Sequence, residues 1–345
     1  MNTDELIPTL RRRLPAWSPA DSGELLYGRL RLSLNLNGLP FPARLGSAER
    51  QALHSYVLGR EDLLEGLELR CTLGEMPPDE QEFLEERWLA EPGGIGQGDA
   101  ELLLACDEHG GMLVGAHDHL SFHVIGTCEE LLSGLNWLDS RRRMLEQSPG
   151  LALGRQGELV VSSPFLCGHG TLLSLVLHLP GLAWWGQIES TLDPLYDEGF
   201  SYRTWQEGFG DFILLENLSA QNDPDPRTLL NRALEILNPV FARESNARAE
   251  LRAHRELELQ DRIHRAIALC AGSRMMSYSE FVEHASMLRL ASQMGHSLPC
   301  PISPLLLELA PAHLQQSSGE SGDGRRMARL RADRLREVFG NARGS

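Results

Sequence analysis

The stretch from Gly157 to Pro180, GELVVSSPFLCGHGTLLSLVLHLP, constrains the fold of this chain more than any other. An apolar, strand-like run (159–161) ends at Ser163, a loop of small residues spans 167–170, and a second apolar run ends at the closing proline. A strand, a glycine-containing loop and an apolar element in this order typically form a ligand site under the backbone N–H groups of the loop. A tight turn between two core segments explains the same pattern, and the residues alone leave both interpretations open.

The length and composition indicate a soluble globular protein with room for two domains. Of the 345 residues, 42% are hydrophobic and 23% are charged, which is typical of such proteins. The arginines at 11–13 are not followed by the apolar segment of a signal peptide. The most apolar run, 172–185, is too short to span a bilayer and contains a proline. We therefore expect a cytoplasmic protein without a membrane partner.

The net charge and the cysteines argue against several other classes of protein. A net charge of −16 argues against a nucleic-acid partner, because phosphate binding needs a basic face. The six cysteines are scattered without a CxxC pair, which argues against a disulfide framework or a zinc site. All 32 basic residues are arginine. A genome biased toward arginine codons is the ordinary explanation for the absence of lysine. The alternative is that lysine is avoided or that surface arginines are themselves modified.

Two arginines in the first third of the chain form a candidate phosphate clamp. The segment 24–36 alternates as a strand does. Arg29 and Arg31, two positions apart on an extended chain, then project from the same face. Such a pair is also common on the solvated edge of a sheet.

The segment 100–124 predicts a hairpin with its turn at 109–111. On a single second strand, His117, His119 and His123 point to one face, as in some metal sites. We predict no metal site here, because no carboxylate or thiolate is seen to converge on the three histidines.

Together these motifs resemble those of the ATP:guanido phosphotransferases. Residues 163–172 are similar to the family's Cys-Pro-x-x-x-Gly-Thr-Gly-Leu-Arg signature, with Ser163 at the reactive cysteine and Leu172 at a phosphate-binding arginine. Residues 27–31 resemble the Ser-Ser-Arg-Ile-Arg nucleotide motif. Residues 116–121 resemble Glu-Glu-Asp-His-x-Arg, with His117 and Ser121 at a carboxylate and an arginine. Around Arg203 and Glu207 the chain is similar to the family's Arg-Gly-x-x-Gly-Glu.

The resemblance implies a role for nine residues. Those implied in nucleotide binding are Arg29, Arg31, His119, Arg203 and Trp88. Those implied in catalysis are Glu207, Asp118, Ser163 and His117.

From Arg227 onward, acidic and basic residues recur at the spacing of helices. Residues 256–295 resemble the C-terminal helical domain of the bacterial protein-arginine kinases, the McsB-type branch, which the metabolite guanido kinases lack. A generic amphipathic helical hairpin is the alternative. Arg325 and Arg329 resemble the two arginines of the family's phosphoarginine-reading motif, with Arg326 in place of its aspartate. A solvated helix face explains these arginines equally simply.

The fold class expected is α+β. It comprises a phosphotransferase-like domain over 1–245, with a small helical N-terminal part and an antiparallel sheet flanked by helices, and a helical, dimerising domain over 246–345. The resemblance implies an ATP-dependent protein-arginine kinase using Mg²⁺. It also implies a homodimer, a protein substrate and a small zinc-binding activator protein as partner. The alternative is a catalytically inactive pseudokinase that binds a partner or phosphoarginine. It is suggested by Ser121 and Leu172 at two arginine positions and by Ser163 at the position of the reactive cysteine.

Overall fold

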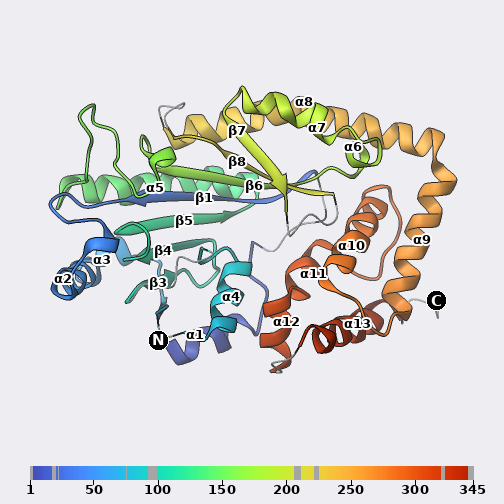
Figure 1. The fold of residues 1–345 in the computed structure, drawn as a ribbon, viewed down its shortest axis with the longest axis horizontal. Coiled ribbons are helices and arrows are strands. Elements are labelled where there is room, and N and C mark those ends of the chain that lie inside the picture. The colour runs from blue at the N-terminus through green and yellow to red at the C-terminus, as the bar shows by residue number, and fades with distance from the viewer. Residues whose placement is uncertain are drawn as a thin grey trace. The chain divides into compact units, whose positions relative to one another are not determined.

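The computed structural model describes residues 3–17, 21, 23–74, 76–91, 99–205, 211–220, 225–319 and 323–340 (Figure 1). The chain divides into two compact units. The first comprises 1–17, 28–174 and 217–232, and the second comprises 18–27, 175–216 and 233–345. The domain boundary expected between residues 245 and 246 stays a prediction.

Within the described residues, eight strands form one antiparallel sheet in the order β2-β3-β4-β5-β1-β6-β8-β7 (Figure 1). Their bounds are β1 Leu25–Leu34, β2 Leu69–Thr72, β3 Glu101–Leu104, β4 Gly110–Val114, β5 Leu120–Gly126, β6 Thr171–His178, β7 Phe200–Thr204 and β8 Phe212–Asn217. The register of β1 against β5 pairs Arg31 with His123 and Ser33 with Ser121. The sheet with its flanking helices confirms the α+β class.

The helices of the first unit are α1 Thr3–Leu10, α2 Ser47–Leu58, α3 Glu61–Leu64, α4 Pro78–Glu86 and α5 Cys128–Gln147, with 3-10 turns at Pro42–Arg44 and Pro164–Leu166. Helix α5 begins with a capping box between Thr127 and Glu130. It covers one face of β5, where Trp137 meets the ring of Phe122 edge-on at 5.8 Å. Because neighbouring strand residues point to opposite faces, Ser121 and His123 lie on the face away from α5.

The remaining helices are α6 Pro180–Trp184, α7 Ile188–Leu192, α8 Pro226–His254, α9 Glu256–Gly272, α10 Tyr278–Gln293, α11 Ser303–Glu308, α12 Pro311–Ser318 and α13 Gly324–Gly340, with a 3-10 turn at Asp193–Tyr196. Leu259 and Ile263 of α9 pack with Leu290 of α10 in a buried cluster. This confirms the helical C-terminal region. Among the described helices, none is long and apolar enough to cross a membrane.

One predicted element differs from the structure. The expected second strand of the 100–124 hairpin is two strands, because the chain turns between Gly115 and His119, with Gly115 N donating to His119 O at 2.9 Å. Gly115 adopts φ +71, which glycine allows without steric cost. The prediction that three histidines share one face of a single strand is therefore wrong.

Candidate functional site

Arg29 and Arg31 converge on one carboxylate oxygen. Both lie on β1, and both contact Oε1 of Glu91, Arg29 through Nη2 at 3.7 Å and Arg31 through Nη1 in direct contact. Their side chains are each 13% exposed, and that of Glu91 is 19% exposed. Two partly desolvated guanidinium groups that share one anionic oxygen form an anion site at the surface of the sheet.

Trp88 completes this cluster on one side. It lies just beyond the end of α4, with φ 60. Its carbonyl oxygen accepts a hydrogen bond from Arg29 Nη1 at 2.8 Å. The Cζ atom of Arg29 also lies 5.7 Å from the centroid of the indole ring, within the range of a cation–π interaction. Trp88 thus holds the guanidinium of Arg29 through both its backbone and its side chain.

The strand next to the arginine pair contributes neutral groups. Burial, followed by the charges of Arg29 and Arg31, lowers the pKa of His123 to about 3. His123 is therefore uncharged near neutral pH. Two pairs further along the register, on the same face, Ser33 Oγ and Ser121 Oγ lie 3.4 Å apart and are buried. A hydroxyl, which carries no charge, thus occupies the position where the resemblance places an arginine.

A small pocket brings further predicted residues to this cluster. Its lining residues are Leu73, Ala90, Glu91, Leu113, Ala116, His117 and Ser121. His117 and Ser121 therefore line the same pocket as Glu91, the residue that contacts both arginines of the pair. His117 is exposed, so its ring is accessible from solvent.

Asp118 and His119 are buried and hold neighbouring segments of the chain together. Oδ1 of Asp118 accepts hydrogen bonds from Asn35 Nδ2 and from Ser162 N, both at 2.7 Å. His119 Nδ1 accepts from Leu36 N at 2.9 Å, so its Nε2 carries the hydrogen and donates to Pro40 O at 2.7 Å. Burial lowers the pKa of His119. The catalytic role of Asp118 and the nucleotide-binding role of His119 stay predictions.

The loop that follows Ser163 uses its backbone N–H groups internally. Ser163 itself is half-buried and precedes the 3-10 turn. The next N–H groups donate within the fold, namely Gly168 to Leu159 O at 3.1 Å, His169 to Ala220 O at 3.3 Å, Gly170 to Leu166 O at 3.1 Å and Thr171 to His169 Nδ1 at 3.2 Å. A ligand site under these four N–H groups is therefore a wrong prediction. The tight-turn interpretation describes the loop correctly.

The two remaining predicted residues do not belong to the described residues of the first unit. Arg203 is on β7 in the second unit, where its side chain is 67% exposed and its Nε lies 3.8 Å from Oε2 of Glu216. Glu207 lies outside the described residues. The roles of both residues stay predictions.

Sequence reasoning missed Glu91 and the strand neighbours of the arginine pair. Glu91 precedes a Pro-Gly-Gly break, but no local pattern relates it to β1, because the contact joins residues far apart in the chain. The serine pair and His123 depend on the register of β1 against β5, which the sequence does not define. Within the described residues, no group of three His, Cys, Asp or Glu side chains could hold a metal ion.

Comparison with known sequences places the chain beside one family. A family model described as the protein-arginine kinase McsB C-terminal domain matches residues 256–345. The protein-arginine kinase of Pelotomaculum thermopropionicum is 26% identical over 342 residues, covering 94% of this chain and 96% of the relative. That of Symbiobacterium thermophilum is 25% identical over 350 residues, covering 96% and 99%. The chain is a homologue of the protein-arginine kinases.

Solved structures support the fold of this protein-arginine kinase homologue. The crystal structure of a lombricine kinase matches with a TM-score of 0.51 and 14% identity, covering 69% of this chain and 71% of that one. The duplicated taurocyamine kinase of Schistosoma mansoni matches with the same TM-score of 0.51 and 14% identity. That match covers 70% of this chain and only 37% of the longer taurocyamine kinase. At this level of identity the likeness establishes the guanido-kinase-like fold.

Proposed function

We propose that this chain transfers the γ-phosphoryl group of ATP to arginine side chains of a protein substrate. The observation that carries the proposal is the convergence of Arg29 and Arg31 on one oxygen of Glu91. An arginine pair that already gathers around an anionic oxygen is suited to phosphate oxygens. Homology to the protein-arginine kinases over nearly the whole chain supports this choice of reaction.

The reaction forms a bond between a guanidino nitrogen and the γ-phosphorus while the bond from that phosphorus to the β-phosphate oxygen breaks. The guanidinium loses one proton in the process. In this proposal Arg29, Arg31 and Arg203 neutralise the phosphate charge, and Glu207 orients the guanidinium and accepts the proton. Trp88 holds Arg29, while Asp118 and His119 support the loop that carries His117.

Mg²⁺ fits this proposal as a companion of the nucleotide. Such an ion usually binds to proteins through one or two carboxylates together with water and substrate phosphates. When bound, it adds positive charge at the γ-phosphate. Because Glu91 already contacts both arginines, the ion would be held mainly by the phosphates of the nucleotide and by water.

The second candidate function is that of a pseudokinase that binds phosphoarginine as a scaffold. Ser121 and Leu172 are uncharged at two positions where the resemblance places arginines, and one transition-state arginine contributes roughly 10³–10⁵ in rate. A cavity of about 660 Å³ in the C-terminal region offers an alternative anion site. It is lined by Met275, Arg325, Arg326, Arg329, Leu330 and Asp333.

One experiment separates the two functions. The protein is incubated with γ-labelled ATP and an arginine-rich protein, and the product is assayed for acid-labile phosphoarginine. We expect such a product from the wild-type protein and none from the Arg31→Ala variant, with folding checked by circular dichroism. Nucleotide binding by calorimetry without any product would instead select the scaffold. Loss of phosphoarginine binding in an Arg325→Ala, Arg329→Ala double variant would then locate the scaffold's site.

The proposal extends to domains, partners and location. We propose that residues 246–345 form a separate domain that joins two copies of the chain, and that a small zinc-binding activator protein binds this cytoplasmic dimer. Light scattering of the full chain, compared with a variant that ends at residue 245, tests the dimer. A full chain that stays monomeric at working concentrations contradicts it.

A further inference from the structure

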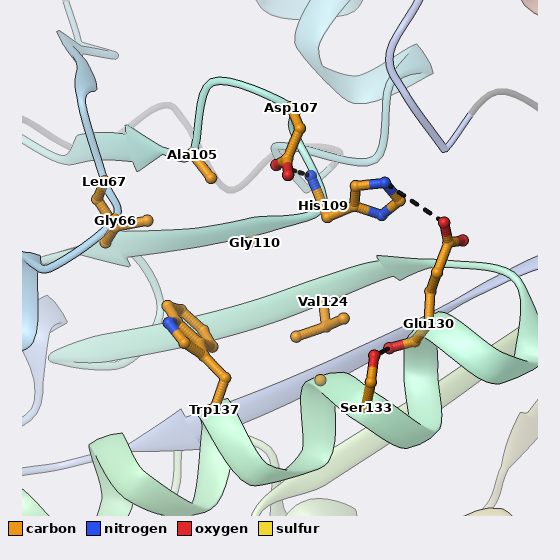
Figure 2. Close-up of a pocket in the computed structure, with 11 residues that line it drawn as sticks. Gly66, Leu67, Ala105, Asp107, His109, Gly110, Val124, Glu130, Ser133 and Trp137 are labelled. Carbon is orange, nitrogen blue, oxygen red and sulfur yellow. Dashed lines mark hydrogen bonds and ion pairs between the residues drawn. The ribbon is translucent and has the colours of Figure 1, made fainter.

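The first unit contains a second cavity, of about 320 Å³, that the proposed reaction does not use. It lies between α5, the start of β4 and the chain at 66–67 (Figure 2). Its lining residues are Gly66, Leu67, Ala105, Asp107, His109, Gly110, Val124, Glu130, Ser133, Gly134 and Trp137. Val124 points to the α5 side of β5, whereas its neighbour His123 points to the side of the arginine pair. The cavity is therefore distinct from the candidate site, and its volume suits a small ligand or one side chain.

The interior of this cavity is apolar and presents an indole ring. Figure 2 shows Trp137 projecting from α5 toward β5, with Val124 beside it. A Cβ atom built on Gly110 would lie 4.0 Å from Cζ2 of Trp137, and one on Gly66 would meet no described atom within 4 Å. The lining glycines therefore leave room next to the ring. The ring already attracts one guanidinium, because Cζ of Arg141 lies 5.0 Å from its centroid.

The mouth of the cavity is anionic, with the side chains of His109 and Glu130 facing each other. His109 Nδ1 lies 2.9 Å from Ile125 O. A carbonyl oxygen only accepts, so Nδ1 carries the hydrogen and donates to it, and Nε2 faces the mouth. That nitrogen lies 3.5 Å from Oε1 of Glu130 (Figure 2). An N–H group of a ligand in the cavity can donate to this carboxylate at the mouth.

Hydrogen bonds within the fold hold both carboxylates at the mouth in place. Oε2 of Glu130 accepts from the backbone N–H of Thr127 at 2.6 Å and from its hydroxyl at 2.9 Å, which leaves Oε1 directed at His109. Oδ1 of Asp107 accepts from His109 N at 3.0 Å, so the carboxylate is held at the mouth. The cavity thus combines an aromatic wall with two fixed carboxylates.

We propose that this cavity binds the side chain of an arginine from a partner protein. The guanidinium is planar, carries five N–H donors and stacks on aromatic rings, so it matches both the indole and the acceptors. Its three methylene groups lie against the apolar walls. A lysine ammonium has no flat face and is more strongly hydrated, so it fits less well. The net charge of −16 favours such a basic partner. This inference goes beyond the proposed reaction and does not depend on it.

Calorimetry on the full chain tests the site with N-acetyl-arginine amide as the probe and N-acetyl-citrulline amide as its uncharged isostere. We expect millimolar binding of the arginine probe and binding of the citrulline probe that is weaker by about tenfold or more. Glu130→Gln keeps the acceptor that caps α5 and removes the charge, and it should weaken arginine binding by about tenfold. Asp107→Asn is a second variant expected to act in the same direction.

Two control variants locate the binding. Glu146 lies on the same helix but outside the cavity, where its carboxylate accepts from Arg142 at 2.8 Å, so Glu146→Gln should leave binding unchanged. Glu207→Gln would weaken binding only if the probe occupies the acceptor site of the proposed kinase. The inference would be overturned if both probes bound equally, or if no heat of binding were detected at millimolar arginine probe. It would also be overturned if folded Glu130→Gln and Asp107→Asn bound the arginine probe as the wild-type protein does, or if Glu207→Gln lost binding of that probe.

Discussion

At the scale of the residue, Glu91 sets the charge that the arginine pair presents to a nucleotide. Its carboxylate contacts both Arg29 and Arg31, so a bound phosphate must compete with it. We predict that Glu91→Gln binds ATP about tenfold more tightly, because the phosphate then no longer has to displace the carboxylate from the arginines. A charge-assisted contact of this kind contributes about 1.5–3 kcal/mol, and water replaces only part of it when the contact is broken. Isothermal titration calorimetry measures the change.

Glu146→Gln removes the same charge from an exposed ion pair on α5 and serves as the control for this comparison. Weaker ATP binding by Glu91→Gln would show that Glu91 positions the arginines instead of competing for them. If neither protein binds ATP, the nucleotide site itself is wrong.

A second prediction at this scale concerns Gly170, where the loop approaches β1. The residue has φ +74, and a Cβ atom there would lie 2.7 Å from Ser33 O. Gly170→Ala should therefore lower the free energy of unfolding by about 2–4 kcal/mol, from backbone strain and the clash together. Gly157 is the matched control, because it has φ +85 but its Cβ would meet no described atom within 4 Å.

Gly157→Ala should cost only about 1 kcal/mol, the strain alone. Urea denaturation of both variants measures the difference. Equal losses of stability would mean that the loop moves away from β1 without cost.

At the scale of the element, a buried ion pair joins α4 to the β3–β4 turn. Arg87 Nη1 lies 2.6 Å from Oε2 of Glu108, with side chains 1% and 0% exposed. Arg87 Nη2 also donates to Leu10 O at 2.8 Å and to Arg13 O at 2.7 Å. Burial lowers the pKa of Arg87 and raises that of Glu108, so each charge depends on its partner.

We predict that Arg87→Met lowers the free energy of unfolding by about 3–5 kcal/mol, because it leaves a buried carboxylate without its cation. Replacing both residues, as Arg87→Met with Glu108→Leu, should cost less than the sum of the single changes. Denaturant unfolding of the four proteins of this cycle provides the test. Additive losses would show that the two charges do not interact.

Glu244 on α8 predicts a pH dependence of stability. It is buried and accepts from Gly181 N and Leu182 N at 2.8 Å each. Burial raises its pKa to about 7, above the ordinary value near 4.3 of an unfolded chain. Between these values the folded protein binds more protons than the unfolded one. The contribution of this group to stability is therefore full below about pH 4 and is lost as the pH rises toward 7.

The free energy of unfolding of the wild-type protein should thus fall by roughly 2–3 kcal/mol more between pH 5 and 7.5 than that of Glu244→Gln. Chemical denaturation at several pH values gives both slopes. Parallel slopes would mean that Glu244 is ionised throughout this range.

The elements show what the sequence could and could not predict. The strand expected within 24–36 was predicted with nearly the observed bounds of β1, Leu25–Leu34, because its residues alternate as those of a strand do. The split between β4 and β5 was missed, because Gly115 interrupts an alternating run that otherwise looks continuous. The contact of Glu91 with β1 and the cavity at Trp137 arise from packing between distant segments, which periodicity does not encode.

At the scale of the whole molecule, the charge balance predicts how the protein meets its partners. The chain carries 48 acidic residues against 32 arginines, a net charge of −16. Such a field attracts basic proteins over a distance that salt shortens from about 30 Å at 0.01 M to about 3 Å at 1 M. We predict that the association rate with an arginine-rich protein falls by about tenfold or more between low and high salt. Stopped-flow mixing over a salt series measures this rate.

Two controls separate steering by the whole charge from binding at one site. The same arginine-rich protein with its arginines converted to citrulline should associate slowly at every salt concentration, because it has lost the charge that is attracted. N-acetyl-arginine amide, with a single charge, should bind with a much shallower salt dependence, because fewer screened charges take part. An association rate that is independent of salt for the arginine-rich protein would mean that contacts at close range, and not the acidic surface, select the partner.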